Sequence, residues 1–541
     1  MRWNVEKRKS ENILTHLLKL RGVESAKDFL NPPSPYNLTA AQVGIDEAQL
    51  VKAIARIKKA IKNKETIVVY GDFDIDGVSA TAIMWETLHE LGAVVWPYIP
   101  DRKSEGYGFS KAGIKCVKEK HSPTLVITVD HGITAPDFVK QLADDGVDVI
   151  VTDHHQAPAE SQMKLLHKHS LAVLHTTVLA GAGISWFVSR QLDNLRDNPE
   201  RLALAALGTI GDVLPLQGPN RQIVSHGLPL LSQSNRVGIR SLLQESGLLG
   251  IDLDPYHIGY ILGPRINAAG RLGDALDALR LLCTKDERAA IAIAQKLASL
   301  NRKRQLMTNE QINTSLEQLK DVKGMPPLLV IADSSYDEGI IGLIAGSLSR
   351  RFYRPTIVIA QNENGISKAS ARSIPGVDII KLIRQVEDQL VNAGGHTMAA
   401  GFSLETANIS QVAEELIQKA VDQIDPELLE RVLNIDLELN VEEITRDLLD
   451  KIENLKPFGT SNEKPIFSMS QIYLDDVRKI GKEGNHLKVK VSGIDAIGFS
   501  KVYLLEKIDI KEPVDIAFTL DLNVWNGNEN LQLMIKDIRQ G

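Results

Sequence analysis

The sequence predicts an α/β fold whose first half holds a parallel sheet, and two observations lead to this prediction. Short apolar runs at residues 66–70, 124–129 and 147–152 alternate with stretches of helical character, as in a doubly wound sheet. Each run is followed at once by acidic residues. Ligands of such folds bind just beyond the carboxyl ends of the strands, so these polar residues stand where a functional site is expected.

The alternation is regular from Glu65 onward. The expected elements are a strand at 66–70, a helix at 79–91, a strand at 93–98, a helix at 110–120, a strand at 124–129, a helix at 137–144 and a strand at 147–152. An alanine- and leucine-rich helix at 201–207 follows, and Asp212 comes after it. This order favours parallel strands joined by helical crossovers.

The second half of the chain predicts three further parts. Residues 284–320 contain almost no glycine or proline, which indicates a long connecting helix with Asn301 as the candidate position of a break. Apolar runs at 327–332 and 356–360 flank a helical stretch at 340–351 and indicate a smaller α/β unit. From Val432 onward, short alternating runs separated by turn residues are typical of a small β-barrel.

Composition excludes some classes of protein. A chain of 541 residues is too long for one core, so several domains are expected. No apolar run is long enough for a membrane span and the N-terminus turns polar at once, so we expect a cytoplasmic protein without membrane contact. The two cysteines, Cys116 and Cys283, lack metal-ligand spacing. The net charge of -7 does not decide the substrate, because metal-binding carboxylates contribute to it.

The acidic clusters have the composition of a site for two metal ions. Asp74 and Asp76 follow the first strand in a turn, Asp130 follows a neighbouring strand, and His154 adds an imidazole. Oxygen-rich sites with few imidazoles suit Mn²⁺ or Mg²⁺. Two such ions about 3.5 to 4 Å apart lower the pKa of a shared water and stabilise both oxygens in phosphoryl transfer. The sequence therefore predicts hydrolysis of a phosphate ester.

Each motif taken alone has another interpretation, but the motifs taken together favour a metal site. The spacing of acidic residues from Asp72 could be a calcium loop, but Ile83 occupies the twelfth position, where such a loop needs a glutamate. Taken alone, Asp130 or Asp212 is more often a helix cap or turn residue than a metal ligand. Their placement after consecutive strands favours the functional interpretation.

These residues resemble the motifs of the DHH phosphoesterases, and the resemblance extends to the C-terminus. Within that superfamily the chain is similar to the metal-dependent exonucleases that degrade single-stranded DNA from the 5′ end in repair and recombination. The resemblance implies two Mn²⁺ or Mg²⁺ ions and assigns His155 to the scissile phosphate and Asp153 to the support of its neighbours. The metal ligands that it implies are Asp72, Asp74, Asp76, Asp130, His154 and Asp212.

The resemblance also implies residues that bind the nucleic acid. Arg102 would grip the 5′-phosphate together with Ser370 and Arg372, and a guanidinium fork that favours a terminal phosphate would explain the polarity of cutting. Basic and small residues in two other segments would hold the strand: Arg265, Asn267, Arg271, Gly394, Gly395 and His396.

The implied organisation has five parts. They are a helical N-terminal lead-in at 1–64, a DHH catalytic domain at 65–283, a connecting helix at 284–325, a DHH-associated domain at 326–430 and an OB-fold nucleic-acid-binding domain at 431–541. The chain departs from the family pattern in the loop after His155.

The resemblance further implies single-stranded DNA as partner, a single-strand-binding protein and a helicase as protein partners, and a monomer. Two alternatives remain at this stage. One is a phosphodiesterase for oligoribonucleotides or cyclic dinucleotides, and the other is a non-catalytic nucleic-acid-binding scaffold.

Overall fold

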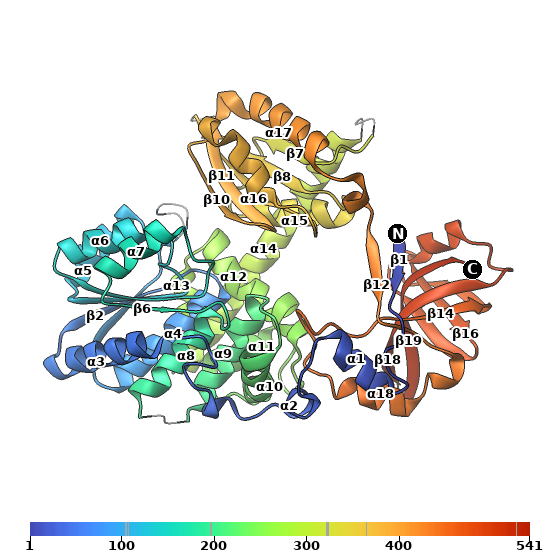
Figure 1. Ribbon diagram of the computed structural model, residues 1–541, viewed down its shortest axis with the longest axis horizontal. Coiled ribbons are helices and arrows are strands. Elements are labelled where there is room, and N and C mark those ends of the chain that lie inside the picture. Colours follow the sequence, from blue (N-terminus) through green and yellow to red (C-terminus); the bar gives the residue numbers. More distant parts are fainter. Residues whose placement is uncertain (103–104, 106–107, 195–196, 321–323, 364, 526) are drawn as a thin grey trace.

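The computed structural model describes residues 1–102, 105, 108–194, 197–320, 324–363, 365–525 and 527–541. Figure 1 shows three bodies: an α/β domain of the first half, a smaller α/β domain joined to it by the helix α14, and a C-terminal barrel. None of the helices in the described ranges is long and apolar enough to cross a membrane.

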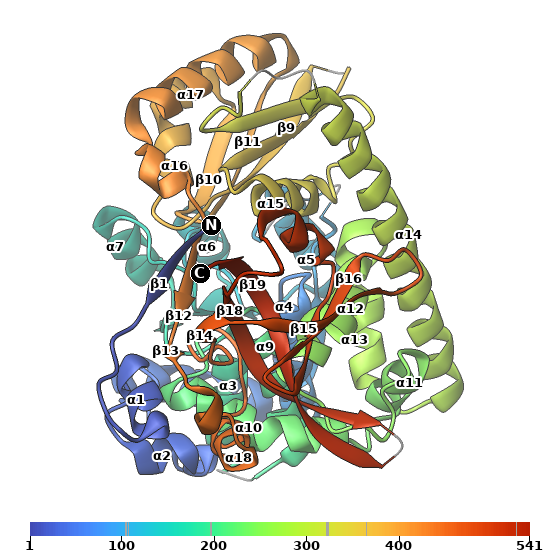
Figure 2. The same cartoon turned by 90° about the vertical axis from the view of Figure 1, so that its right-hand side faces the viewer.

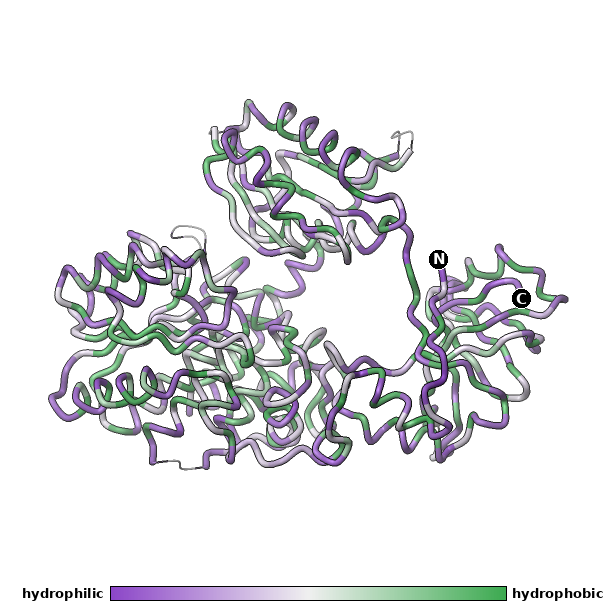
Figure 3. The backbone as a smooth tube through the Cα atoms, viewed as in Figure 1, coloured by the Kyte–Doolittle hydropathy of each residue, from purple (hydrophilic) through white to green (hydrophobic). Residues whose placement is uncertain are grey.

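The first domain is built on a parallel sheet of five strands in the order β3-β2-β4-β5-β6. The strands are β2 (Thr66–Tyr70), β3 (Val94–Tyr98), β4 (Leu125–Val129), β5 (Asp148–Asp153) and β6 (Ala172–His175). The strands expected from the apolar runs are confirmed within about a residue. Figure 3 shows how hydrophobic residues concentrate along them.

Both faces of this sheet are covered, which explains why its strands are apolar without alternation. Ile67, Val69 and Ile127 pack toward α3 (Glu47–Asn63), α4 (Ile75–Glu90) and α8 (Gly181–Leu192). Val68 and Val126 belong to the core on the opposite face, under α5 (Lys111–His121), α6 (Pro136–Asp144) and α7 (Glu160–His169). The carboxyl ends of the strands stay open to ligands.

A helical extension follows the sheet and packs on the α4 and α8 side. Its helices are α9 (Pro199–Gly211), α10 (Gly218–Ser232), α11 (Val237–Glu245), the π-helix η2 (His257–Leu262), α12 (Gly263–Leu272) and α13 (Ala275–Cys283).

The connecting helix α14 (Glu287–Leu319) is a single unbroken helix of 33 residues, so the break considered at Asn301 is wrong. Asn301 is 4% exposed. Burial of this side of the helix against α11 and α12 stabilises the helical backbone more than asparagine's weak intrinsic propensity destabilises it. Figure 2 shows α14 running along one side of the molecule toward the smaller domain.

The smaller α/β domain has a mixed sheet in the order β10-β11-β9-β8-β7. Its strands are β7 (Leu329–Asp333), β8 (Thr356–Ala360), β9 (Ile366–Arg372), β10 (Asn392–His396) and β11 (Ala399–Glu405), and its helices are α15 (Ile341–Phe352), α16 (Ile379–Ile383) and α17 (Ile409–Gln423). The apolar runs predicted β7, α15 and β8. The antiparallel strands β9 to β11 were not predicted.

The C-terminal barrel is a seven-stranded sheet in the order β13-β14-β18-β19-β17-β16-β15, which confirms the predicted all-β module. Its elements are β13 (Leu437–Glu438), α18 (Arg446–Glu453), β14 (Phe467–Ile472), β15 (Leu474–Ile480), β16 (His486–Val491), β17 (Ile494–Gly498), β18 (Val514–Trp525) and β19 (Asn528–Gln540).

The N-terminal segment packs on the barrel and is not helical throughout. β1 (Arg2–Val5) pairs in parallel with β12 (Val432–Ile435), beside the barrel in Figure 1. Leu17 and Leu18 of α1 (Ile13–Leu20) and Phe29 of α2 (Ala26–Leu30) lie in the barrel core. Arg221 of α10 stacks on Phe29, 3.8 Å from guanidinium carbon to ring centroid, and donates to carbonyls of Phe29, Leu455 and Lys456. These contacts join the barrel to the first domain.

Candidate active site

The loop after β2 places two carboxylates through hydrogen bonds to helix N-termini. Asp74 is the N-cap of α4, and its Oδ1 accepts from the backbone N–H groups of Asp76 and Gly77, both at 2.9 Å. Asp76 accepts from the N–H groups of Gly181 and Ala182 at the start of α8, at 2.6 and 2.9 Å. Both carboxylates are thereby held at the carboxyl edge of the sheet.

Asp130, directly after β4, belongs to two groups of potential metal ligands at once. It lies with Asp72 and Asp74 in one group and with His154 and His155 in another, each with ligand atoms within 4.8 Å of one another. Its backbone is in the left-handed region, with φ of 66°, which aspartate tolerates better than most residues. Asp130 is therefore placed to bridge two cations.

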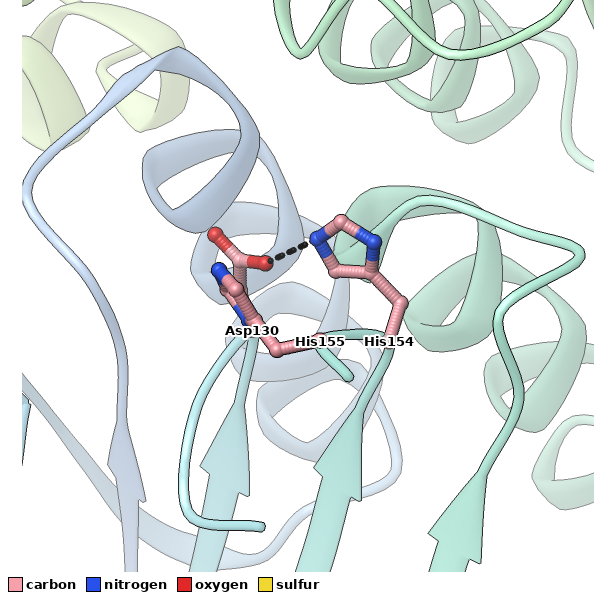
Figure 4. Close-up of side chains that lie close together, drawn as sticks. All are labelled: Asp130, His154 and His155. Carbon is pink, nitrogen blue, oxygen red and sulfur yellow. Dashed lines mark ion pairs between the residues drawn. The ribbon is translucent and has the colours of Figure 1, made fainter. Parts of the chain in front are cut away.

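His154 faces three carboxylates of the site. Its Nε2 lies 3.1 Å from Asp130 Oδ1, 3.4 Å from Asp212 Oδ2 and 3.8 Å from Asp76 Oδ2. Asp76, His154 and Asp212 form the third group of potential ligands. Figure 4 shows Asp130 and the two histidines converging from the ends of neighbouring strands. Asp212 is the C-cap of α9, which brings it in from the helical extension.

The polar atoms of this cluster fit divalent cations. Asp130 Oδ1 and His154 Nε2 are buried, and neither makes a hydrogen bond. Buried polar atoms are normally hydrogen-bonded, and these two have only each other at 3.1 Å, among further carboxylates, so the group suits a cation between them. Hard oxygen donors with one imidazole are what Mn²⁺ and Mg²⁺ prefer. Asp72, Asp74 and Asp130 would hold one ion, and Asp76, Asp130, His154 and Asp212 the other.

The carboxyl pKa values support the same interpretation. Burial and the neighbouring Asp74 raise the pKa of Asp76 to about 7. Burial, Asp76 and Asp74 raise the pKa of Asp212 to about 8. The pKa of Asp130 is also well above its ordinary value, because of burial and then Asp76. Mutual repulsion of this kind is relieved by cations, not by the protein itself.

Asp153 is a supporting residue and not a ligand in this geometry. Its Oδ1 accepts from the N–H of His154 at 2.7 Å and from Nδ1 of His155 at 2.8 Å, and its Oδ2 accepts from the N–H of Ile133 at 2.8 Å. Although burial opposes it, these hydrogen bonds hold the pKa of Asp153 below its ordinary value. Asp153 is therefore ionised and orients both histidines.

The pKa of His155 is raised by the carboxylates around it. Burial lowers its pKa, but the hydrogen bond to Asp153 and the charges of Asp153, Asp212 and Asp72 raise it to about 9 overall. The imidazole is 30% exposed, so it is accessible to a ligand. A protonated imidazole at this position attracts a phosphate oxygen.

A basic group adjoins the metal-binding carboxylates. The guanidinium carbon of Arg102 lies 5.0 Å from the centre of the Phe73 ring. Arg102 interacts electrostatically with Asp72 and Asp74, and Arg372 with Arg102. Arg372 Nη1 donates to Ser370 Oγ at 3.2 Å. Burial lowers the pKa of both arginines. Clustered, partly desolvated guanidinium groups fit an anion with several oxygens.

The start of α15 completes this basic group from the smaller domain. A Cβ on Gly342 would lie 3.0 Å from Ser370 Oγ and from Arg372 Nη2, so this glycine lets the helix N-terminus lie close to both side chains. Helix N-termini bind phosphate through backbone N–H groups. The group therefore combines the first domain, through Arg102, with the smaller domain.

Arg271, at the end of α12, joins the same basic group. Its Nη1 donates to the carbonyl of Gly339 at 3.2 Å, a contact between the two α/β domains. Burial and the charges of Arg102, Arg304 and Arg372 lower its pKa to about 10.

Two of the residues predicted to bind the strand have partners within the protein. Arg265 pairs with Glu245 at 2.9 Å and donates to the carbonyl of Ile261 at 2.8 Å. Asn267 Oδ1 accepts from the N–H of Ile75 at 2.7 Å, at the start of α4 between Asp74 and Asp76. The contacts of Arg265 and Asn267 with the strand stay predictions.

His396 approaches the site from β10 of the smaller domain. Its ring lies 6.4 Å from that of His155, nearly parallel to it at 19°. Burial and the charge of His155 lower its pKa. Gly394 leaves open space where a side chain would stand, and Gly395 has φ of 140°, which favours glycine.

Several functional residues were not found from the sequence. A side chain on Gly181 would lie 2.6 Å from Asp130 Cβ, and one on Gly208 would lie 2.4 Å from Asp76 Oδ1. The N-terminus of α8 donates to Asp76 from the loop that departs from the family pattern. The available signal was the small-residue run at 180–183, which permits such close approach.

Fold and site together define the class of protein, a DHH phosphoesterase. Three family descriptions match: the DHH family N-terminal domain at residues 66–209, the DHHA1 domain at 325–425 and the RecJ OB domain at 435–537. A curated relative from Bacillus subtilis named single-stranded-DNA-specific exonuclease RecJ is 34% identical, over 99% of this chain and 70% of its own length. The chain belongs to the RecJ family.

Further comparisons agree. The RecJ of Thermus thermophilus is 32% identical over 91% of this chain and 71% of its own length. The crystal structure of that organism's RecJ in complex with Mn²⁺ matches with a TM-score of 0.85 at 27% identity, over 100% of this chain and 80% of that one. Its complex with Mg²⁺ gives a TM-score of 0.80 at 27% identity, over 100% of this chain and 78% of that one.

Proposed function

We propose that the protein is a metal-dependent exonuclease that degrades single-stranded DNA from the 5′ end to mononucleotides. The observation that carries this proposal is the position of Asp130 between two groups of ligands, with the basic group of Arg102, Ser370 and Arg372 beside them. The relatives are named single-stranded-DNA-specific exonucleases.

The metal centre accounts for hydrolysis. Two divalent cations, Mn²⁺ or Mg²⁺, would supply a water of lowered pKa and stabilise charge on the attacking and leaving oxygens. Asp130 would bridge the ions, Asp153 orients His154 and His155, and protonated His155 would contact the scissile phosphate. Asn267 holds the loop that carries Asp74 and Asp76.

The basic group accounts for direction. A terminal phosphate carries more charge and more free oxygens than an internal diester, so the guanidinium groups of Arg102 and Arg372 would favour it. A strand whose 5′-phosphate is bound there presents its first internal bond to the neighbouring metals. We further propose Arg271, His396 and the backbone at Gly394 and Gly395 as contacts to the strand close to this bond.

The biological setting is part of the proposal. Degradation of single strands from the 5′ end serves DNA repair and recombination. A single-strand-binding protein and a helicase that supplies the strand remain predicted partners, and a cytoplasmic monomer remains the expectation.

The test compares substrates and metals in one assay. Single-stranded DNA with a 5′-phosphate, duplex DNA and RNA are each incubated with Mn²⁺ or Mg²⁺, and released mononucleotides are measured. We expect release from single-stranded DNA alone, and no release by Asp130→Asn, whose amide suits the same backbone conformation but cannot bridge two cations. Preferred cleavage of short RNA would instead support the oligoribonucleotide phosphodiesterase, and binding without cleavage would support the scaffold.

A further inference from the structure

A stacked pair of exposed tyrosines stands at the start of the helical segment that leads to the active site. Tyr256 and Tyr260 are 60% and 73% exposed. Their ring centroids lie 4.9 Å apart with the planes inclined by 24°. Single exposed aromatic residues are common, but a stacked pair leaves a large flat apolar surface in water, which often marks an interaction site.

The backbone places this pair and the active site on one continuous helical segment. The π-helix η2 continues into α12, because residues on both sides of the junction have helical dihedral angles. Pro264 lacks an N–H and so cannot bond the carbonyl of Tyr260, which favours the widened π turn here. Tyr260 precedes Arg271 by eleven residues, or about 17 Å at the rise of a helix.

Tyr256 also borders the cleft between the first domain and the barrel. It lines a cleft of about 950 Å³ whose walls come from α10, from α18 and from the barrel. Phe458 adds a further aromatic ring to the lining.

Most of the negative charge in this cleft is paired. Three of its four carboxylates form ion pairs with a lysine or arginine, Asp450 with Arg446, Glu453 with Lys456 and Asp521 with Lys464, and Asp254 lies 2.7 Å from the imidazole of His257. The cleft therefore repels a polyanion less than four unpaired carboxylates would.

We propose that Tyr256 and Tyr260 form a base-stacking platform for the single strand between the barrel and the metal centre. The inference rests on the proposed function, since it concerns the same substrate. Aromatic faces stack on any base without sequence preference, whereas the bases of a duplex are already stacked on one another. The platform thus adds selectivity for single strands at a distance from the reacting bond.

The experiment compares Tyr256→Ala/Tyr260→Ala with Tyr256→Phe/Tyr260→Phe, which keeps the ring faces. Both tyrosines are exposed, so neither double substitution removes core packing. We expect the alanine pair to lower kcat/KM on long single strands by about tenfold or more, because one lost base stack alone has an effect of about that size. The phenylalanine pair keeps wild-type values, and both pairs cut oligonucleotides too short to reach the platform as the wild type does.

A binding measurement separates this inference from the proposed function. In an Asp130→Asn background, abasic sites are placed along the segment of strand beyond Arg271. Abasic sites should weaken binding to the protein with both tyrosines and leave binding to the alanine pair unchanged. Equal losses in both proteins, or unchanged activity of the alanine pair on long strands, would overturn the platform and leave the tyrosines as a surface for another ligand. Failure of the wild type to hydrolyse DNA would count against the proposed function, while binding still decides the platform.

Discussion

The Oδ1 atom of Asn267 lies 2.7 Å from the backbone nitrogen of Ile75 and accepts its hydrogen bond. This contact ties α12 to the loop between Asp74 and Asp76, although the two segments are almost two hundred residues apart in the chain. Asn267 therefore supports the first turn of α4, which carries Asp76, and its contact with the nucleic acid stays a prediction.

Replacement of Asn267 by alanine should weaken metal binding without changing contacts to DNA. Lost support for a ligand loop typically reduces metal affinity by about 10- to 100-fold. We expect the Mn²⁺ concentration for half-maximal activity to rise accordingly, with activity recovered at high Mn²⁺ and the KM for DNA unchanged. A raised KM with unaltered metal dependence would show that Asn267 contacts the strand instead.

The sheet of the catalytic domain could be predicted because each strand is a short apolar run bounded by helical sequence. Thr66–Tyr70 is found as expected, and so is Thr356–Ala360 in the smaller domain. The pairing of strands that lie far apart in the chain has no comparable signal in the sequence. Nothing local in Arg2–Val5 indicates that it joins Val432–Ile435, because a parallel partner can come from anywhere in the chain.

The metal centre could be predicted better than the residues around it. Carboxylates at strand ends must converge, since parallel strands share one edge. By contrast, the ion pair of Arg265 with Glu245 of α11 depends on helix packing that sequence patterns do not reveal. The close approach of Gly181 to the Asp130 side chain was likewise hidden, because such an approach appears in the sequence only as a small residue.

Asp130→Asn should abolish hydrolysis and stabilise the metal-free protein. Burial, and then the charges of Asp76 and Asp74, raise the pKa of Asp130 well above its ordinary value, so a charged Asp130 destabilises the folded metal-free protein and an amide in its place does not. At about pH 8 with a chelator, we expect a gain of about 1 kcal/mol in unfolding free energy. Thermal unfolding with and without Mn²⁺ measures this. A lower melting temperature of the chelated variant would contradict repulsion as the source of the shifts.

Stability of the metal-free protein should fall as pH rises from about 6.5 to 8.5. Asp76 and Asp212 have folded pKa values of about 7 and 8 against an ordinary 3.8, so the folded state holds protons that the unfolded chain has already lost. Such stabilisation disappears as pH passes the folded pKa values. His155, with a pKa raised to about 9, acts in the same direction.

The two carboxyl groups alone lower the free energy of unfolding by about 3 kcal/mol over this pH range, and His155 adds to this. His131 and His154 have the opposite effect on stability, but mainly below this pH range, because their pKa values are lowered from 6.5 to about 4. Chemical unfolding in chelator at several pH values provides the measurement, and Mn²⁺ should remove most of the pH dependence. A chelated protein that becomes more stable toward pH 8.5 would be incompatible with protonated carboxyls in the site.

Arg102→Lys should reduce the preference for a 5′-phosphate over a 5′-hydroxyl end. A lysine keeps the charge but cannot offer two parallel hydrogen bonds to a phosphate, and the loss of one charge-assisted bond costs about 1.5 to 3 kcal/mol, or about tenfold or more in kcat/KM. Arg265→Lys is the matched control, because Arg265 is paired with Glu245 outside the basic group. Competition between phosphorylated and unphosphorylated strands in one reaction gives the preference directly. The assignment of the 5′-phosphate to Arg102 is wrong if Arg265→Lys lowers the preference and Arg102→Lys leaves it intact.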